Sequence, residues 1–449
     1  MNVVVINGSP KGKNSITLQT VLFLEKRFTN TKFTVLNVGQ QIKSLEKDMS
    51  TEIEAIDKSD VILFSYPVYT FIAPYQLHRF IELLKEQRVD LSDKFVTQIT
   101  TSKHFYDVTA HKYVEENSID LNAKIIKGLS ADMEDLLTEK GQEEAIAFWK
   151  YVEFCVDNDM YEMIPKKKAA VQKPTYEKSL KNVDKKDEFE IAIVTNCEKD
   201  DVNLQNMIDD FMVAFPYKTK LINIREYQFS GGCLGCFNCA ATGKCIYKDN
   251  FDSYLRNEIQ TASSIVYAFT IKDHSMGASF KIYDDRQFCN GHRTVTMGMP
   301  IGYIISGDYQ SESNLQMIIE GRAEVGHTFL ASIATDECNT AQSLINLSKK
   351  LAFALENKTV LPQNFYGVGG MKIFRDLIYI MRGMMKADHK FYKKHGIYDF
   401  PQKKIGTILK MHLVGILISM PSVQKKMKDK MSDAMILPYK KVIDSNLDK

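Results

Sequence analysis

Short apolar runs alternate with amphipathic stretches through the first 157 residues. The runs are rich in β-branched residues and bounded by turn residues, which predicts buried strands at 2–7, 32–38, 60–67 and 94–100, with a weaker strand at 123–129. Helical spacing lies between them, at 16–28, 50–59, 74–88 and about 140–157. Ser50 or Thr51 is the expected N-cap of the second helix. This order predicts a parallel sheet covered by helices on both faces.

The pattern stops at 158–187, a lysine-rich stretch with two prolines and no apolar periodicity, which predicts a linker. It then starts again. The second set of predicted strands comprises 188–196, 217–224, 262–269, 300–306 and 326–334, followed by a closing helix at 338–356. Order and spacing repeat the first set, so the sequence predicts two copies of one α/β unit.

The predicted fold class is therefore α/β, with two tandem doubly wound parallel sheets and a helical carboxyl-terminal extension. The expected domain limits are 1–157, a linker at 158–187, 188–358, and a basic helical tail at 359–449. From residue 365 onward the chain has 17 Lys and Arg against 7 Asp and Glu, a net charge of +10. The tail helices are expected either to pack on the domains or a second subunit, or to lie on an anionic membrane surface.

Bulk composition excludes few functions. The chain has 449 residues, 44% of them hydrophobic and 25% charged, and a net charge of +2, which indicates a globular protein and gives no reason to expect a nucleic-acid partner. Residues 1–7 lack the basic region of a signal peptide, and no run is long enough for a membrane span. A cytoplasmic location is expected, where cysteines stay reduced.

The loop after the first strand, "INGSPKGKNSITLQ" (6–19), opens the first helix. Helix N-termini bind anions because their first N–H groups are unpaired and the helix dipole is positive there. The hydroxyls and amides of this loop can bind phosphate oxygens, and its lysines add positive charge. The candidate residues are Ser9, Lys11, Asn14, Ser15 and Thr17. Neither an NTP-binding P-loop nor a dinucleotide G-x-G-x-x-G is present, so a monophosphate such as that of FMN fits best.

A second loop, "SYPVYTFIAPYQLHRFIE" (65–82), follows the third strand. In a doubly wound sheet the carboxyl ends of the first and third strands meet near the switch point, where ligands bind. Pro67, Val68, Tyr69 and Thr70 can supply backbone N–H groups and an apolar wall for a flat ring. Thr101 lies in a third loop, 100–105, which would close over that ring.

These two segments resemble the flavodoxin-like NADPH-dependent FMN reductase family, over about residues 1–155. The resemblance implies FMN, with its phosphate on Ser9, Lys11, Ser15 and Thr17 and its ring against Pro67 to Thr70. It also implies NAD(P)H as electron donor. Ile16 stands where the family usually has Asn. No catalytic side chain is assigned, since flavin chemistry needs no strong general base.

Four of the eight cysteines fall within fifteen residues, "GGCLGCFNCAATGKC" (231–245), as Cys233, Cys236, Cys239 and Cys245. In a reducing compartment this spacing favours metal binding over a disulfide framework. The run is tighter than the usual zinc arrangement and nearer the compact run of cluster ferredoxins. Zinc, a cluster and no metal all remain open on the residues alone.

The cysteine run also resembles that of the iron–sulfur flavoproteins, a branch of the same family, which implies a [4Fe–4S] cluster on these four cysteines. The second unit lacks the G-S-P core in its own first loop and carries acidic residues there, so it is expected to have lost a phosphate site. We therefore expect FMN on the first unit, the cluster on the second, and an internal pseudo-dimer or homo-oligomer that brings the two together. The expected function is FMN-dependent electron transfer from NAD(P)H or a reduced carrier to an unknown acceptor. The alternatives are a cluster-free quinone or nitro-compound reductase and a non-enzymatic flavin electron carrier.

Overall fold

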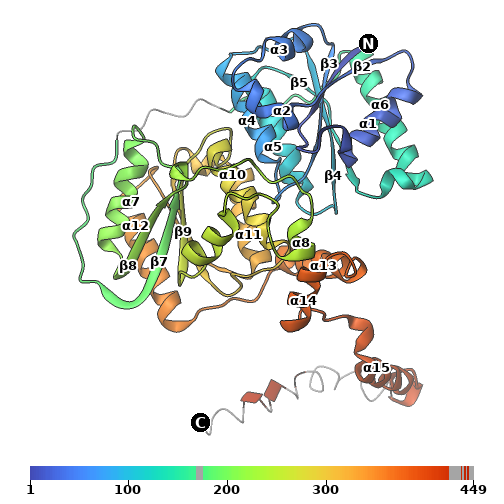
Figure 1. Cartoon of the computed structure of the whole chain (residues 1–449). Helices are drawn as coiled ribbons and strands as arrows, with labels where there is room; N and C mark the ends of the chain where they lie inside the picture. Colours follow the sequence, from blue (N-terminus) through green and yellow to red (C-terminus); the bar gives the residue numbers. More distant parts are fainter. Residues whose placement is uncertain (168–174, 424–435, 437–438, 441, 444–449) are drawn as a thin grey trace. The chain divides into compact units, whose positions relative to one another are not determined.

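The computed structural model describes residues 1–167, 175–423, 436, 439–440 and 442–443. Residues 1–391 form one compact unit, and residues 392–449 belong to a second unit. The first unit contains two parallel sheets, one built from each half of the predicted repeat (Figure 1). Part of the predicted linker, 168–174, lies outside the described residues, as does most of the tail beyond 423.

The first sheet has the order β2-β1-β3-β4-β5, with β6 also pairing with β4, and every pairing is parallel. Its strands are β1 (Asn2–Asn7), β2 (Lys32–Leu36), β3 (Val61–Pro67), β4 (Phe95–Ser102), β5 (Lys124–Ile125) and β6 (Leu129–Asp132). The helices are α1 (Ile16–Arg27), α2 (Val38–Leu45), α3 (Ser50–Asp57), α4 (Tyr75–Glu86), α5 (Asp107–Asp120) and α6 (Glu139–Asp157).

The second sheet has the order β11-β10-β9-β7-β8, which is the same order of strands in the second half, again all parallel. Its strands are β7 (Lys186–Thr195), β8 (Tyr217–Asn223), β9 (Ser264–Thr270), β10 (Pro300–Ser306) and β11 (Phe329–Thr335). The helices are α7 (Val202–Ala214), α8 (Asn238–Thr242), α9 (Phe251–Tyr254), α10 (Gly277–Arg286), α11 (Ser313–Gly326) and α12 (Thr340–Asn357). The prediction of two tandem doubly wound sheets is confirmed.

Both faces of each sheet are buried, which explains why the strands are continuous apolar runs. In β1, Val3 and Val5 enter the core that contains Trp149, whereas Val4 and Ile6 enter the core on the opposite face. In β7, Ile191 and Ile193 enter one core, and Ala192 and Val194 enter the core on the opposite face. The period-two alternation of a strand thus supplies two cores at once.

Four local predictions were wrong or incomplete. Helix α5 (Asp107–Asp120) was not predicted. Helix α2 was missed, because it begins two residues after β2 and its apolar residues extended the apparent strand. The predicted strand 123–129 is divided into β5 and β6. Gly128 lies between them against β4, where an added Cβ would be 2.4 Å from Gln98 Cγ. Finally, the N-cap of α3 is Met49, not Ser50 or Thr51.

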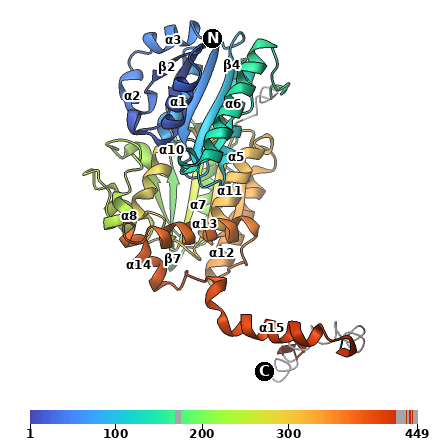
Figure 2. The same cartoon turned by 90° about the vertical axis from the view of Figure 1, so that its right-hand side faces the viewer.

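The two halves meet through equivalent helices, α4 and α5 from the first and α10 and α11 from the second, and we call this contact the seam. Figure 2 shows α5, α10 and α11 at the junction of the two sheets. The backbone N–H of Tyr75 at the start of α4 donates to Asp285 at 2.7 Å, and that of Ala278 in the first turn of α10 donates to Glu82 at 2.7 Å. These reciprocal contacts are those of a pseudo-two-fold dimer within one chain.

The loops before α4 and α10 mirror each other as well. Tyr69 and Ile72 form an isolated bridge in the first, and Lys272 and Ser275 form one in the second. Each loop is held by the opposite helix, since Lys281 of α10 bonds Thr70, and His78 of α4 bonds Asp273. The duplication thus extends beyond strand order to the hydrogen bonds at the seam.

Past α12 the chain continues into α13 (Phe365–Ile380), α14 (Lys386–Lys394) and, in the second unit, α15 (Ile405–Ile418). Helix α13 packs against α11: an added Cβ on Gly367 would be 2.7 Å from the carbonyl oxygen of Glu324, and one on Gly370 would be 2.7 Å from Val325 Cγ2. The first of the two expectations for the tail, packing on the domains, therefore holds for α13. None of the described helices is both long enough and apolar enough to cross a bilayer.

Candidate functional site

The loop between β1 and α1 brings three buried hydroxyls together. Ser9, Ser15 and Thr17 are each almost fully buried. Ser15 is the N-cap of α1 and accepts from the N–H of Leu18, and Thr17 shares a 2.7 Å hydrogen bond with Thr101 at the end of β4. The first amides of α1 have no partner inside the helix, and the helix dipole makes this end positive. The loop therefore has the chemistry of an anion site.

The loop between β3 and α4 lies at the adjacent strand end. Val68 donates its N–H to the carbonyl of Thr101 at 3.2 Å, which ties this loop to β4. Thr70 and Phe71 have φ angles of +49° and +74°. Two successive non-glycine residues in this region are costly unless surrounding contacts hold them.

The second half of the chain supplies those contacts. Lys281 donates to the hydroxyl of Thr70 at 2.8 Å, and Arg322 donates to its carbonyl at 2.7 Å. The Thr70 hydroxyl in turn donates to Asp284 at 2.7 Å. Lys281 is fully buried, so this ionic group is fixed in a water-poor setting. The conformation of the first half's loop thus depends on α10 and α11.

A cavity of about 490 Å³ opens between these loops and the second half. Nine of the ten predicted cofactor-binding residues line it: Ser9, Lys11, Ser15, Thr17, Pro67, Val68, Tyr69, Thr70 and Thr101. Asn14 does not; it is exposed and belongs to the short 3-10 turn Gly12–Asn14. Ile16, the departure from the family pattern, does line the cavity.

The four clustered cysteines line the same cavity: Cys233, Cys236, Cys239 and Cys245. The segment that carries them, Gly231–Cys245, is called the cysteine segment below. It lies directly against the β3–α4 loop, where an added Cβ on Gly235 would be 2.1 Å from the hydroxyl oxygen of Tyr69. The ammonium of Lys11 stands 5.8 Å from the ring centre of Phe237. Thiols of the second half and the anion loop of the first half therefore share one site.

The thiols are close enough to raise one another's pKa, but no three of their sulfur atoms lie within 4.8 Å of one another in the described part of the chain. Burial raises the pKa of Cys233 and of Cys239, and the neighbouring thiols contribute in the same direction. Among the described residues, the one group of three potential ligands within 4.8 Å of each other contains no cysteine. Zinc bonds of about 2.3 Å would place the sulfurs only ~3.8 Å apart. Among the described residues, no three of the cysteine sulfurs lie that close together.

A fifth thiol, Cys289, was not singled out by the sequence, because it lies far beyond the cysteine run. It is buried and lines the same cavity. Burial raises its pKa to about 12. All eight cysteines are free thiols.

Arg286 at the end of α10 holds the cysteine segment in place, and no local sequence signal points to it. Its guanidinium bonds both carboxylate oxygens of Asp249, at 2.8 and 2.7 Å, and donates to the carbonyl of Gly231 at 2.9 Å. It lies 4.5 Å from the ring centre of Tyr247 and 3.9 Å from the sulfur of Cys245. Only 1% of this residue is exposed, so a buried positive charge ties both ends of the segment together.

Helix α13 supplies another wall of the cavity through Ile373, Phe374 and Leu377. Further along, Asp388 of α14 is fully buried and bonds both His292 and Arg293. Arg293 also donates to the carbonyl of Cys239 at 3.2 Å. Residues far beyond the second sheet thus complete a site that begins at Ser9.

At the equivalent strand ends of the second half, acidic side chains occupy the positions where a phosphate would bind. Asp201, the N-cap of α7, accepts from Thr270, and Asp336 accepts from Ser306 at 2.6 Å and from the N–H of Gly307 at 3.0 Å. These carboxylates use the donors at the ends of β9 and β10 and would repel a phosphate. The expected loss of a phosphate site there has this physical basis.

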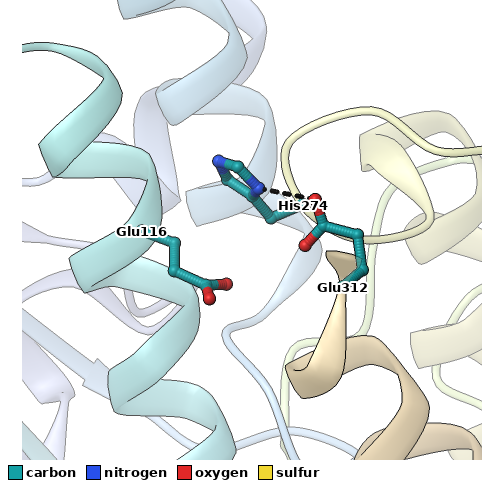
Figure 3. Close-up of side chains that lie close together, drawn as sticks. All are labelled: Glu116, His274 and Glu312. Atoms are coloured by element: carbon teal, nitrogen blue, oxygen red, sulfur yellow. Dashed lines mark hydrogen bonds and ion pairs between the residues drawn. The ribbon is translucent and has the colours of Figure 1, made fainter. Parts of the chain in front are cut away.

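Glu116, His274 and Glu312 form the close group noted above, at the seam (Figure 3). Both ring nitrogens of His274 are hydrogen-bonded, Nδ1 to Glu312 and Nε2 to Asp120, each at 2.9 Å. Burial alone would lower the pKa of His274, but these bonds outweigh it and raise the pKa to about 9. An imidazolium has no lone pair for a metal, and Lys167 already pairs with both glutamates. This group is an ionic contact between the halves.

Part of the first half matches a known family model. Residues 1–95 match a family model described as a flavodoxin-like fold. No curated protein matches the chain. Among solved structures, general stress protein 14 of Treponema denticola in complex with FMN is similar at 13% identity over 34% of this chain and 98% of that chain, with a TM-score of 0.28.

Two more solved structures are similar to about a third of the chain. An FMN-dependent NADH-azoreductase from Bacillus anthracis matches at 13% identity over 35% of this chain and 98% of that one, with a TM-score of 0.28. An NADH:FMN oxidoreductase matches at 16% identity over 36% and 91%, with a TM-score of 0.31. The strand orders and the family match together lead to one conclusion: the chain consists of two tandem flavodoxin-like α/β units followed by a helical carboxyl-terminal region.

Proposed function

We propose that this protein is an FMN-dependent oxidoreductase that takes electrons from NAD(P)H or a reduced carrier and passes them to an acceptor. The observation that carries the proposal is that the anion loop, the β3–α4 loop and the clustered cysteines line one cavity. A buried, mixed polar and apolar cavity of this kind is the usual form of a cofactor site.

In this proposal the FMN phosphate binds Ser9, Lys11, Ser15 and Thr17, where hydroxyls, helix amides and a lysine converge. The ring lies against Pro67, Val68, Tyr69 and Thr70, with Thr101 beneath the phosphate loop. Bound FMN would supply hydride and one-electron chemistry. The protein's own task is then to bind, orient and exclude water, which the ionic group around Thr70 supports.

The proposal includes a [4Fe–4S] cluster on Cys233, Cys236, Cys239 and Cys245. Four thiols on one cavity wall, in a segment held by a buried arginine, support it. Each proposed domain then binds one cofactor: residues 1–157 bind FMN and residues 188–358 bind the cluster. Because the seam joins them inside one chain, no second subunit is required for this arrangement. The proposed setting is the cytoplasm, where these thiols stay reduced.

Anaerobic purification followed by flavin, iron and sulfide analysis tests the proposal. We expect one FMN and four irons per chain, with flavin peaks and broad absorbance near ~400 nm that bleaches with dithionite. A Cys236→Ser variant should keep FMN, lose iron and transfer electrons more slowly. Flavin peaks without iron would support the cluster-free reductase instead, and flavin without NAD(P)H oxidation would support an electron carrier. A polypeptide that stays colourless with excess FMN would end the proposal.

A further inference from the structure

Helix α15 exposes apolar side chains in all directions. Between Ile405 and Met420 eight large apolar residues are exposed, among them Ile405 and Leu413 at 64% and Ile416 at 61%. Within its own unit, none of the described residues of α15 is buried. A helix that is apolar all round normally lies in a protein core or in lipid.

The length of α15 determines how the helix can interact with a bilayer. Fourteen residues at about 1.5 Å each give roughly 21 Å, less than the ~30 Å of a bilayer's hydrocarbon core. Apolar segments of this length occur as buried core helices or as interfacial elements that enter one leaflet, and they do not span a bilayer. Lys403 and Lys404 precede it and Lys410 lies within it, and long lysine side chains can keep their charge in water while their stems lie in lipid.

Charge is distributed unevenly between the two units. Residues 392–449 contain twelve lysines and five aspartates, a net charge of +7. Residues 1–391 contain 46 basic and 51 acidic residues, a net charge of −5. Any attraction to an anionic surface must therefore come from the carboxyl-terminal unit. The same charge opposes pairing of two copies through α15, because each copy would bring +7 to the contact.

We propose that α15 and its flanking lysines bind this protein to the surface of an anionic membrane, with the helix buried in one leaflet. Apolar burial supplies the affinity, and the lysines select anionic headgroups. This inference does not depend on the cofactor content of the first unit.

Vesicle flotation of the full-length protein tests it. We expect flotation with vesicles of phosphatidylcholine mixed with phosphatidylglycerol, weaker flotation with phosphatidylcholine alone, and loss of binding as salt rises. Replacing Lys403, Lys404 and Lys410 by Gln should weaken binding to the mixed vesicles about 100-fold, at about fivefold per lysine. Leu413→Asp should abolish flotation. Leu137→Asp, at a site 82% exposed in the first half, should leave it unchanged.

The absence of flotation with the mixed vesicles would overturn the proposal. So would flotation that Leu413→Asp does not reduce. A third overturning result would come from light scattering: a dimer that Leu413→Asp dissociates, without any vesicle binding, would show that a second copy covers the helix. Measuring bound flavin in the floated and unfloated fractions keeps this test separate from that of the proposed function.

Discussion

The carboxylate of Asp285 accepts a hydrogen bond from the backbone N–H of Tyr75, 2.7 Å away across the seam. Tyr75 begins α4, directly after the loop that lines the cavity. Asp285 also pairs with the fully buried Lys281, which bonds Thr70 in the same loop. One acid of the second half therefore fixes both the start of α4 and the group that orients the loop before it.

Asp285→Ala should destabilise the protein by about 3 kcal/mol, because it removes the partner of a buried charge and a helix-start contact. FMN affinity should fall with it, since the Thr70 loop loses its support. Urea unfolding and FMN fluorescence titration measure the two effects. Asp187→Ala, whose carboxylate is 85% exposed and pairs with Lys218, is the matched control and should change neither.

Ser15→Asp should abolish FMN binding while leaving the fold intact. Aspartate caps a helix as well as serine does, but its charge would face the phosphate. The second half already shows this state, because the N-cap of α7 is Asp201. We expect the Kd for FMN to rise at least about 100-fold.

The control for that substitution is Asp201→Ser, which should leave flavin stoichiometry at one per chain. Thermal denaturation should show that both variants are folded. An unchanged Kd in Ser15→Asp would mean that the phosphate binds elsewhere.

Gly235→Ala should separate the cysteine segment from the β3–α4 loop. Its φ is +59°, and an added Cβ would be 2.1 Å from the Tyr69 hydroxyl oxygen. Gly243→Ala is the matched control, since its φ is +81° but the nearest atom would be 3.9 Å away. Both variants carry a backbone cost of about 1–2 kcal/mol, and only the first has the clash.

The measurement is alkylation of individual cysteines, read by mass spectrometry on the iron-free protein. Cys233 should react slowly in the wild type, because burial raises its pKa, and faster in Gly235→Ala alone. Equal rates in both glycine variants would show that strain, not the clash, moves the segment.

Arg286→Met should release the cysteine segment. It removes the bidentate bond to Asp249 and the bond to Gly231, and leaves Asp249 without its buried partner, at a cost of about 3–5 kcal/mol. Faster alkylation of Cys245 in the iron-free chain and less iron retained after anaerobic reconstitution are the expected readouts. Arg286→Lys keeps the positive charge but loses the bidentate hydrogen bonds, so its alkylation rate and iron content should lie between those of the wild type and Arg286→Met. Arg225→Met, a partly exposed arginine paired with Glu198, should match the wild type.

His274 makes the stability of the seam depend on pH. Its pKa is raised to about 9 in the folded protein, so its contribution is fully present below the unfolded value of about 6.5 and is lost as pH rises through 9. The loss should reach up to about 3 kcal/mol between these limits. Urea unfolding across that range should show the decline in the wild type and not in His274→Gln. His104→Gln, with 52% of its side chain exposed, should keep the wild-type decline.

The sequence predicted both sheets and nine of the ten candidate residues on the cavity wall, because strand periodicity and loop chemistry are local properties. The long-range contacts that complete the site are not local. Nothing near Thr70 in the sequence points to Lys281 or Arg322, and nothing near Cys245 points to Arg286. Lys281 and Arg286 lie on α10 and Arg322 lies on α11, and in the sequence both helices look like ordinary charged surface helices. Their roles appear only when the Thr70 loop and the cysteine segment lie against them.

Helix α2 shows the opposite limit, where local reasoning went too far, and Asn14 shows how turn geometry can direct a candidate side chain away from the cavity. Val38 continues an apolar run, yet the chain turns into a helix there because its side chain is buried beside Ile42 and Leu45. Asn14 has the right chemistry for a phosphate but lies in a 3-10 turn that points it to solvent. Turn geometry, which decides both, is set by packing that a periodic pattern does not contain.

The seam also sets an order of events during synthesis. The end of α4 leaves the ribosome roughly 200 residues before the end of α10, a delay of roughly 10–40 s at about 5–20 residues per second. Throughout that delay the nascent first half presents a surface shaped for the second half of any copy on the same polysome. The short covalent connection favours the chain's own second half, since tethering gives it an effective concentration in the millimolar range. The expected misassembled species is therefore an intertwined dimer, in which the first half of each copy pairs at the seam with the second half of the other.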